Sequence, residues 1–424
     1  MKMEHVTGKV HGLLMVTAAM LAVVASAAVK PVEESKLFED FVDPVSGVKS
    51  RMLKTGIVGE NQQSIWFSSK NMTENGRFIM LHVSENEHKP RKDWRYSGKK
   101  TAIVDLEKDA AFVLDGVPGT MNFIDSTQNR LYYIRSDGPS KATICYRALA
   151  EDPQKEIVAC PIPDEVADGR KVGYWCNHIT LSQDRKRVFL DTNVGGGWHA
   201  LQPGETCIQG CVNLETGKYE SWGKTDFCTD HGQICPTDDT LAMVAWEFCW
   251  DSPDGVAYKK KTGWYPRMWL CHKDGRREMI PAREKNYASH EVWDDDGKGF
   301  LWCGGGIYHH DIATGRQECW CREPGAHVNA SPDGRYLVYD RSFDGWWRGC
   351  KWAVQFYNRN TDKKVWIFSV RPEQSPKEKE SRLHPDPHPH FVMNGRYVIS
   401  TMSSADGHMD FLVTPVAPLV EATK

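Results

Sequence analysis

The stretch HPDPHPHF, residues 384–391, places His384, Asp386, His388 and His390 at alternate positions with a proline between each pair. Proline fixes its own φ and keeps the preceding residue out of the helical region, so the stretch is predicted to be extended. Alternate side chains of an extended strand face the same side. Imidazoles and a carboxylate on one side are ligands for a divalent cation, which predicts a metal site. The octet alone is equally typical of a proline-rich surface loop with solvated histidines.

Histidines also stand at one recurrent place, a few residues before a polar turn. They are His231 in DHGQICPTDD, His290 in ASHEVWDDDG, His327 in GAHVNASPDG and His388 in DPHPHFVMNG. Equivalent positions in successive repeats of a closed fold lie at a similar distance from its axis. These histidines are therefore predicted to converge in space although they are far apart in the sequence.

The repeats that would position them are visible along the chain. Seven stretches share one plan, a polar turn followed by a short apolar, β-branched or aromatic run; they begin at Thr73, Asp125, Leu181, Pro236, Trp293, Ser331 and Met393. Five further segments have the pattern of two strands joined by a tight turn; they are residues 146–160, 212–222, 270–280, 310–320 and 357–368. Two hairpins make a four-stranded unit, which predicts an all-β fold, a seven-bladed β-propeller of four-stranded antiparallel blades. Six or eight blades are the alternatives, because the repeats are irregular.

The composition is that of a globular protein without a nucleic-acid-binding surface. The chain has 424 residues, a net charge of −3 and 40% hydrophobic residues, so it can bury a substantial core and has no basic excess. Residues 1–28 have the pattern of a signal peptide: two lysines, then the apolar run GLLMVTAAMLAVV, then the small residues ASAA. We therefore expect a secreted or periplasmic protein with a single β-propeller domain over residues 29–424. No later segment has the length of a membrane span.

Thirteen cysteines in an exported chain permit disulfides. Several of them, Cys235, Cys249, Cys271 and Cys303, lie in strand-like apolar segments. Such surroundings favour buried free thiols at these positions.

The segments around the recurrent histidines resemble consecutive blades of the oligogalacturonate lyases, seven-bladed propeller enzymes of the polysaccharide lyase group. The resemblance lies in WYPRMWLCHKDGRREM, ASHEVWDDDG, GAHVNASPDGRYLVYD and DPHPHFVMNGRYVISTM, and it covers the C-terminal half from Asp230 onward. It implies that an acidic oligosaccharide or polysaccharide is cleaved by β-elimination. It also implies that Arg267 of PRMW is the family's arginine, that His290 of SHEVW is the catalytic base, and that His327 and the HPDPHPHF stretch form a manganese site.

The closing stretch departs from the family pattern at two positions. Asp386 stands where a second histidine is expected, and Leu383 stands where a glutamine is expected. His384 or a shifted register would restore a nitrogen ligand, and Asp386 is itself a good ligand for a hard cation. We expect His327 and His388, with His384 or Asp386, to bind a divalent metal. Mn²⁺ is the first choice, and Ca²⁺ and Zn²⁺ are the alternatives.

The chemistry of uronate cleavage requires these residue types together. β-Elimination removes the weakly acidic proton at C5 and expels the sugar on O4, so the carboxylate beside C5 must be neutralised as negative charge develops. A cation does this as a Lewis acid, and Arg267 is predicted to add a bidentate clamp on a carboxylate. A neutral His290 is suited to take the C5 proton.

Other residues and other functions stay open at this point. His178 and His199 have a separation similar to that of the histidine pair of ulvan lyases, which implies elimination on a glucuronate polymer; otherwise they, like His231, are predicted to bind the acidic sugar. A propeller can also be a non-catalytic scaffold that binds carbohydrate or protein. A binding scaffold has no need of an arginine and a histidine base beside a metal site, so the lyase interpretation is favoured.

Overall fold

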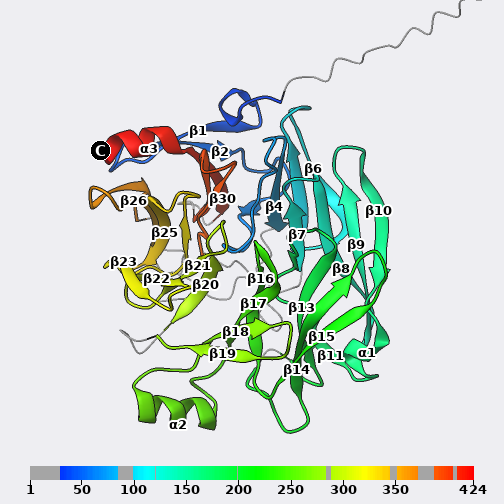
Figure 1. The fold of residues 1–424 in the computed structure, drawn as a ribbon. Coiled ribbons are helices and arrows are strands. Elements are labelled where there is room, and N and C mark those ends of the chain that lie inside the picture. The colour runs from blue at the N-terminus through cyan, green and yellow to red at the C-terminus, as the bar shows by residue number, and fades with distance from the viewer. Residues whose placement is uncertain are drawn as a thin grey trace, which may run out of the picture.

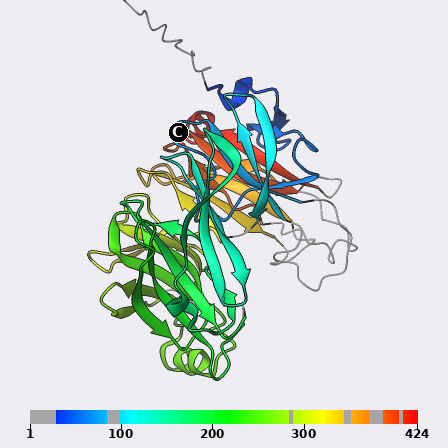
Figure 2. The same cartoon turned by 90° about the vertical axis from the view of Figure 1, so that its right-hand side faces the viewer.

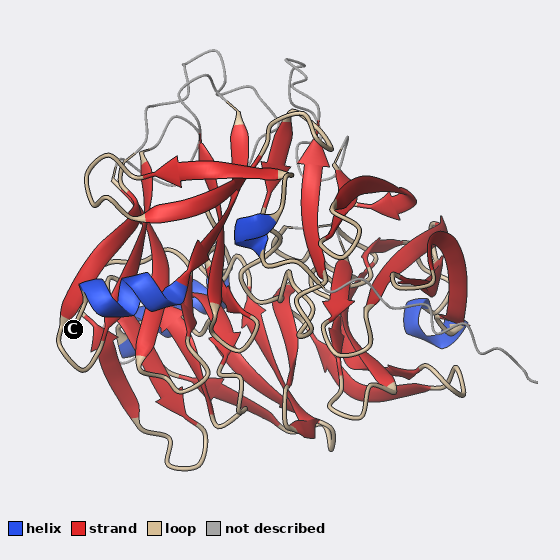
Figure 3. Ribbon diagram, turned by 90° about the horizontal axis from the view of Figure 1, so that it is seen from above, coloured by secondary structure: helices blue, strands red, loops and turns tan. Residues whose placement is uncertain are grey.

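The computed structural model describes residues 29–84, 99–119, 121–197, 199–282, 288–343, 351–370, 386–403 and 408–424. The strands of these residues form seven antiparallel sheets, which follow one another along the chain as the blades of a β-propeller (Figure 1). The predicted all-β fold with seven blades is therefore confirmed. Strands make up nearly all of the regular structure, and the few helices are short (Figure 3).

The first three blades use the N-terminal half of the chain. Blade 1 consists of β3 (Asn61–Gln63), β4 (Phe78–Ser84), β5 (Lys100–Asp105) and β6 (Ala110–Pro118). Blade 2 consists of β7 (Asn122–Asp125), β8 (Arg130–Gly138), β9 (Lys141–Ala148) and β10 (Asp152–Pro161). Blade 3 consists of β11 (Val172–Tyr174), β12 (Thr180–Leu181), β13 (Arg187–Val194), β14 (Thr206–Asn213) and β15 (Tyr219–Thr225), with both β11 and β12 paired to β13.

The next three blades have four strands each in chain order. Blade 4 consists of β16 (Thr229–Cys235), β17 (Asp238–Trp246), β18 (Met268–His272) and β19 (Arg277–Ile280). Blade 5 consists of β20 (Ser289–Trp293), β21 (Gly299–Cys303), β22 (Ile307–Asp311) and β23 (Gln317–Cys321). Blade 6 consists of β24 (Val328–Ala330), β25 (Tyr336–Ser342), β26 (Trp352–Asn358) and β27 (Lys363–Phe368).

Blade 7 closes the ring with strands from both ends of the chain. It has five strands in the order β1 (Phe38–Val42), β2 (Lys49–Leu53), β30 (Met409–Pro415), β29 (Tyr397–Ser403) and β28 (His390–Val392). Figure 2 shows the blue N-terminal and red C-terminal segments side by side. The register of this pairing sets Arg51 opposite Val413 in antiparallel fashion. Closure protects the edge of β30, which would otherwise offer unpaired backbone groups.

The turn chemistry explains why the repeated stretches form hairpins. In the SPDG turn of blade 6, the Asp333 carboxylate accepts hydrogen bonds from the hydroxyl of Ser331 (2.6 Å) and the backbone N–H of Arg335 (3.1 Å). Gly334 follows with φ of +66°, a conformation that glycine adopts without strain. Each of the seven predicted stretches consists of a turn and the strand that follows it, which is the second strand from the inner edge of its blade. The first strands of blades 4 to 7 contact one another around the axis.

The helices are η1 (Val32–Glu34), α1 (Asp164–Ala167), α2 (Pro253–Thr262) and α3 (Val416–Ala422). Across the part of the chain that the structure describes, none of them is long and apolar enough to cross a membrane. The twelve described cysteines are all free thiols, and all except Cys319 are buried. This confirms the expectation of buried free thiols at Cys235, Cys249, Cys271 and Cys303.

Candidate active site and metal centre

Histidines from five consecutive blades form a continuous row at the axis. His178 precedes β12, His231 and His290 lie within β16 and β20, and His327 and His388 precede β24 and β28. The ring centroids are 5.5 Å apart from His178 to His231, 5.5 Å from His231 to His290, 4.0 Å from His290 to His327 and 4.4 Å from His327 to His388. The convergence predicted for the recurrent position is therefore observed, and it extends to His178.

Three of these histidines have a left-handed backbone. The φ angle is +54° at His231, +54° at His290 and +46° at His388. A side chain other than glycine is strained there by about 1–3 kcal/mol. Around His231 and His290 the strand register also shifts, which is the mark of a β-bulge that re-aims a side chain. Strain kept at equivalent points of three blades is typical of a functional site.

His327, Asp386 and His388 form the first triad. All three are buried, and one ligand atom from each lies within 4.8 Å of the others. The ring nitrogen Nε2 of His327 lies 3.8 Å from Oδ2 of Asp386. Asp386, one of the two residues that the sequence offered as the third ligand, thus lies close to both histidines. The other alternative, His384, lies outside the described residues.

Asp340, on β25, contacts the imidazole of His327 and the backbone of both histidines of the first triad. Its Oδ2 accepts a hydrogen bond from Nδ1 of His327 (2.8 Å) and one from the backbone N–H of His388 (3.2 Å). Its Oδ1 accepts from the backbone N–H of His327 (2.7 Å). A carboxylate behind a metal-binding histidine fixes the ring and its tautomer, and here it directs Nε2 toward the triad. The sequence interpretation missed Asp340.

The donor set of the first triad fits a divalent transition-metal ion. Two imidazole nitrogens and a carboxylate oxygen suit Mn²⁺ or Zn²⁺. Nε2 of His327, Nε2 of His388 and Oδ1 of Asp386 are buried atoms that make no hydrogen bond among the described residues, although each residue has other contacts. Burial, and next the neighbouring Asp340, raise the pKa of Asp386 well above its ordinary value. A bound cation would offset both causes, because it would favour the ionised form of Asp386.

His290 is held in one tautomer by the contacts of its Nδ1. Its Nδ1 lies 2.8 Å from the carbonyl oxygen of Ala326, which can only accept, and 2.7 Å from the hydroxyl of Ser289. Nδ1 therefore carries the proton, and the lone pair is on Nε2. Burial, and then the charges of His327, His231 and Arg267, hold the pKa of His290 well below its ordinary value. The ring is thus neutral near pH 7.

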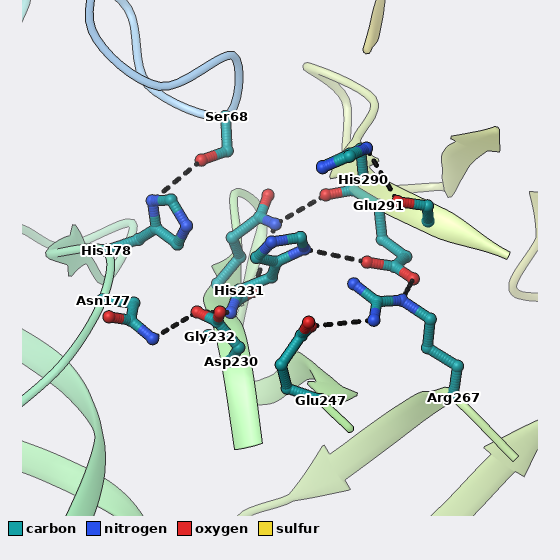
Figure 4. Close-up of polar contacts among 12 residues, drawn as sticks. Ser68, Asn177, His178, Asp230, His231, Gly232, Glu247, Arg267, His290 and Glu291 are labelled. Carbon is teal, nitrogen blue, oxygen red and sulfur yellow. Dashed lines mark hydrogen bonds and ion pairs between the residues drawn. The ribbon is translucent and has the colours of Figure 1, made fainter. Parts of the chain in front are cut away.

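Arg267 is buried between two carboxylates (Figure 4). Its Nε donates to Oε1 of Glu291 (2.9 Å), and its Nη1 donates to Oε2 of Glu247 (2.8 Å). The other oxygen of Glu291 lies 3.0 Å from Nδ1 of His231. Arg267 therefore orients Glu291, and through it His231. Burial alone would raise the pKa of Glu291, but Arg267 and His231 lower it to about 2, so the carboxylate is ionised.

Two aromatic residues from the β3–β4 loop pack into the histidine row, and the sequence interpretation missed both. The Phe67 ring is buried, with its centroid 5.4 Å from that of His290 and 5.0 Å from that of His327. The half-buried Trp66 ring lies 5.1 Å from that of His178 and 4.9 Å from that of His388. Trp66 and Phe67 belong to no repeated sequence pattern. The only sequence clue to them is that they come shortly before the turn stretch of blade 1, which begins at Thr73.

The structure does not bring together the His178 and His199 pair. His178 is buried in the row, and its Nδ1 lies 3.4 Å from the hydroxyl of Ser68. His199 lies at the surface, with Nδ1 2.9 Å from the carbonyl of Ala200 and 3.7 Å from Glu205. Among the described residues, no contact between the two histidines is found, so the ulvan-lyase alternative gains no geometric support.

The chain matches no protein-family model and no curated protein. Among solved structures, it aligns with an oligogalacturonate lyase in complex with manganese at a TM-score of 0.67 and 17% identity, over 90% of this chain and 97% of that one. The fold is that of the oligogalacturonate lyases. A second such lyase, from Vibrio parahaemolyticus, aligns at a TM-score of 0.67 and 19% identity, over 91% of this chain and 98% of that one. The resemblance expected for the C-terminal half thus extends, in fold, along the propeller.

Proposed function

We propose that this chain is a polysaccharide lyase that cleaves uronic-acid oligosaccharides of the oligogalacturonate type by metal-assisted β-elimination, leaving 4,5-unsaturated uronide ends. The observation that carries the proposal is the position of His290. It has a lone pair on Nε2, and its ring centroid is 4.0 Å from that of His327 in the first triad. A base beside a cation site is the pairing that C5 proton abstraction requires.

Each residue has a defined task in this reaction. His327, Asp386 and His388 would hold the divalent cation, Mn²⁺ in the first place, which as a Lewis acid would offset the charge of the carboxylate beside C5. Nε2 of His290 takes the C5 proton, while the Ala326 carbonyl keeps the first proton on Nδ1. Packing of Phe67 against the ring keeps water away and so favours the neutral base.

Arg267 supports the site from behind. Two of its donor positions are used by Glu247 and Glu291, which supports a positioning role in this proposal, and its predicted clamp on a substrate carboxylate stays a prediction. The half-buried Trp66 offers an aromatic face to a sugar ring at the edge of the row. The proposed partner is an acidic oligosaccharide. Export to the periplasm or the medium, proposed from the signal-peptide pattern, fits degradation of such material from pectin.

The test is the ultraviolet absorbance of newly formed unsaturated uronide, measured on oligogalacturonate with and without a chelator. We expect the wild type to produce the signal, the chelator to abolish it and Mn²⁺ to restore it. His290→Gln should lower the rate by about 10²–10⁴, because the positioned base is lost. His272→Ala, at a partly exposed histidine of the third strand of blade 4, is the matched control and should retain the rate.

The same assay separates the alternatives. A methyl-esterified substrate should bind more weakly, because its neutral ester lacks the negative charge that would bind the cation. A signal on ulvan alone that His199→Ala removes would contradict the proposal and assign the reaction to the other histidine pair. The absence of a signal on every uronate tested would contradict the lyase proposal and favour a non-catalytic propeller that binds carbohydrate or protein.

A further inference from the structure

A second triad lies at the other end of the histidine row, and the proposed reaction does not use it. It consists of His178, Asp230 and His231, and one ligand atom from each lies within 4.8 Å of the others. Their exposed fractions are 3%, 6% and 5%, so the group is removed from bulk solvent. Buried charged and polar side chains at this density need compensation by partners or by an ion.

The second triad is constructed in the same way as the first. In each, one histidine comes from the start of the inner strands of one blade, and an aspartate with a second histidine comes from the next blade. Blade 3 supplies His178 and blade 4 supplies Asp230 and His231, as blade 6 supplies His327 and blade 7 supplies Asp386 and His388. The aspartate-paired histidine has a left-handed φ in both, +54° at His231 and +46° at His388.

The groups behind the second triad also follow the metal-site pattern. Glu291 lies 3.0 Å from Nδ1 of His231 and so leaves Nε2 to face the triad. The first triad also has one carboxylate-backed histidine, but there it is His327, the histidine whose own blade supplies no aspartate to the triad. Oδ1 of Asp230 accepts from the backbone N–H of His231 (2.7 Å) and from the side-chain amide of Asn177, as Figure 4 shows. A carboxylate behind the imidazole and a fixed ligand carboxylate are the outer contacts that tune metal sites.

We propose that His178, Asp230 and His231 form a second divalent-cation site, with the two-histidine, one-carboxylate donor set that suits Mn²⁺ or Zn²⁺. The inference does not depend on the reaction. His290 then lies between two cation sites, because its ring centroid is 5.5 Å from that of His231 and 4.0 Å from that of His327.

A role in substrate binding follows if the proposed function holds. A uronate oligomer carries a carboxylate on every sugar, and the first site engages only the one beside the reacting C5. Three protein ligands leave room in the coordination shell for a substrate oxygen. The second site would therefore bind the carboxylate of a neighbouring sugar and contribute to affinity rather than to the chemical step.

The test counts bound metal in the purified mature protein without any sugar. The protein is stripped with a chelator and dialysed against Mn²⁺ alone or Zn²⁺ alone, and the metal per chain is measured by elemental analysis. We expect about two ions for the wild type and for His272→Ala, and about one for His178→Gln, Asp230→Asn or His327→Gln. The combined His178→Gln and His327→Gln variant should bind none. Circular dichroism verifies that each variant is folded, and anomalous diffraction at the metal edge locates each ion.

The outcomes separate this inference from the proposed function. One ion per chain that His327→Gln removes and His178→Gln leaves would overturn the second site, and the triad would then be an ion pair of His231 with Asp230 and Glu291. Two bound ions without lyase activity would support the second cation site and contradict the proposed lyase function. With activity present, His178→Gln should raise KM for oligogalacturonate at least several-fold with a smaller change in kcat, and the reverse split would contradict the carboxylate-binding role.

Discussion

At the scale of single residues, Asp340 decides how well the first triad can bind an ion. Its carboxylate contacts the ring of His327 and the backbone N–H groups of both His327 and His388. In Asp340→Asn the side-chain amide lacks the charge that supports the imidazole as a ligand. We expect Mn²⁺ affinity to fall by about 10–100-fold. Titration calorimetry on the chelator-stripped protein measures this.

Asp333→Asn is the matched control, because Asp333 is a partly exposed carboxylate in the turn of the same blade and contacts only the turn. Its Mn²⁺ affinity should equal that of the wild type. An Asp340→Asn protein with unchanged affinity would show that the ion is bound elsewhere.

The sequence predicted the histidines and Asp386 but not Asp340, although a signal for it exists. Counting outward from the SPDG turn, Val328 pairs with Tyr339, so the next residues outward on the two strands are His327 and Asp340. Hairpin register therefore predicts this contact once the turn is assigned. Glu247 is different, because its contact with Arg267 depends on how a long connection returns to the blade, which no local pattern encodes.

At the scale of elements, the bulged inner strands hold His290 in a conformation that only glycine adopts without strain. His290→Gly should therefore be more stable than His290→Ala by about 1 kcal/mol, because alanine keeps the strain of a φ of +54°. Both variants lose the imidazole, so the difference between their free energies of unfolding reports the backbone strain alone. Urea unfolding monitored by tryptophan fluorescence measures it.

His327 gives the opposite expectation, because its φ is not in the left-handed region. There the glycine variant should be less stable than the alanine variant by roughly 0.5–1 kcal/mol, since glycine loses more backbone freedom on folding. The same order at both positions would contradict the assignment of strain to the bulge.

The number and type of strands could be predicted because each hairpin is specified locally by its turn residues and apolar runs. The left-handed histidines could not, because the register shifts around His231 and His290, between the first and second strands of blades 4 and 5, depend on the folded structure and follow no local residue pattern. The placement of Trp66 and Phe67 at the axis has the same cause. Their loop lies in blade 1, yet their ring contacts are with histidines of blades 3 to 7, so tertiary structure alone brings them together.

At the scale of the whole molecule, the five blades that carry the histidines belong to a ring that closes in blade 7, where β2 pairs with β30. Beyond the pairing of β2 with β30, Asp43 fastens the N-terminal strands to blade 6. Its Oδ2 accepts hydrogen bonds from the backbone N–H (2.6 Å) and hydroxyl (2.9 Å) of Ser369, just after β27. Its Oδ1 accepts from the backbone N–H groups of Val45 (3.1 Å) and Ser46 (2.8 Å).

We expect this contact to make ring closure sensitive to acid. Burial alone would raise the pKa of Asp43, but the hydrogen bonds from Ser369, Ser46 and Val45 outweigh it and lower the pKa below its ordinary value. An unfolded aspartate titrates near pH ~3.9. The folded protein therefore gains stability from the ionised carboxylate above that pH, and loses it as the pH falls through the lower folded pKa. Asp43→Asn should reduce the free energy of unfolding at pH 7 by about 1–3 kcal/mol.

The gap between wild type and Asp43→Asn should narrow as the pH is lowered below about 4, because the wild-type carboxylate then becomes protonated as well. Urea unfolding across pH 3 to 7 provides the measurement. Asp40→Asn is the control, because the Asp40 side chain is 81% exposed in its ion pair with Arg51, and it should shift stability by less than about 1 kcal/mol at every pH. Parallel curves for wild type and Asp43→Asn would show that the carboxylate is not the acid-sensitive link between the first strands and blade 6. A narrowing gap, together with weaker Mn²⁺ binding by Asp43→Asn than by the wild type at pH 7, would connect closure of the ring to the geometry of the first triad.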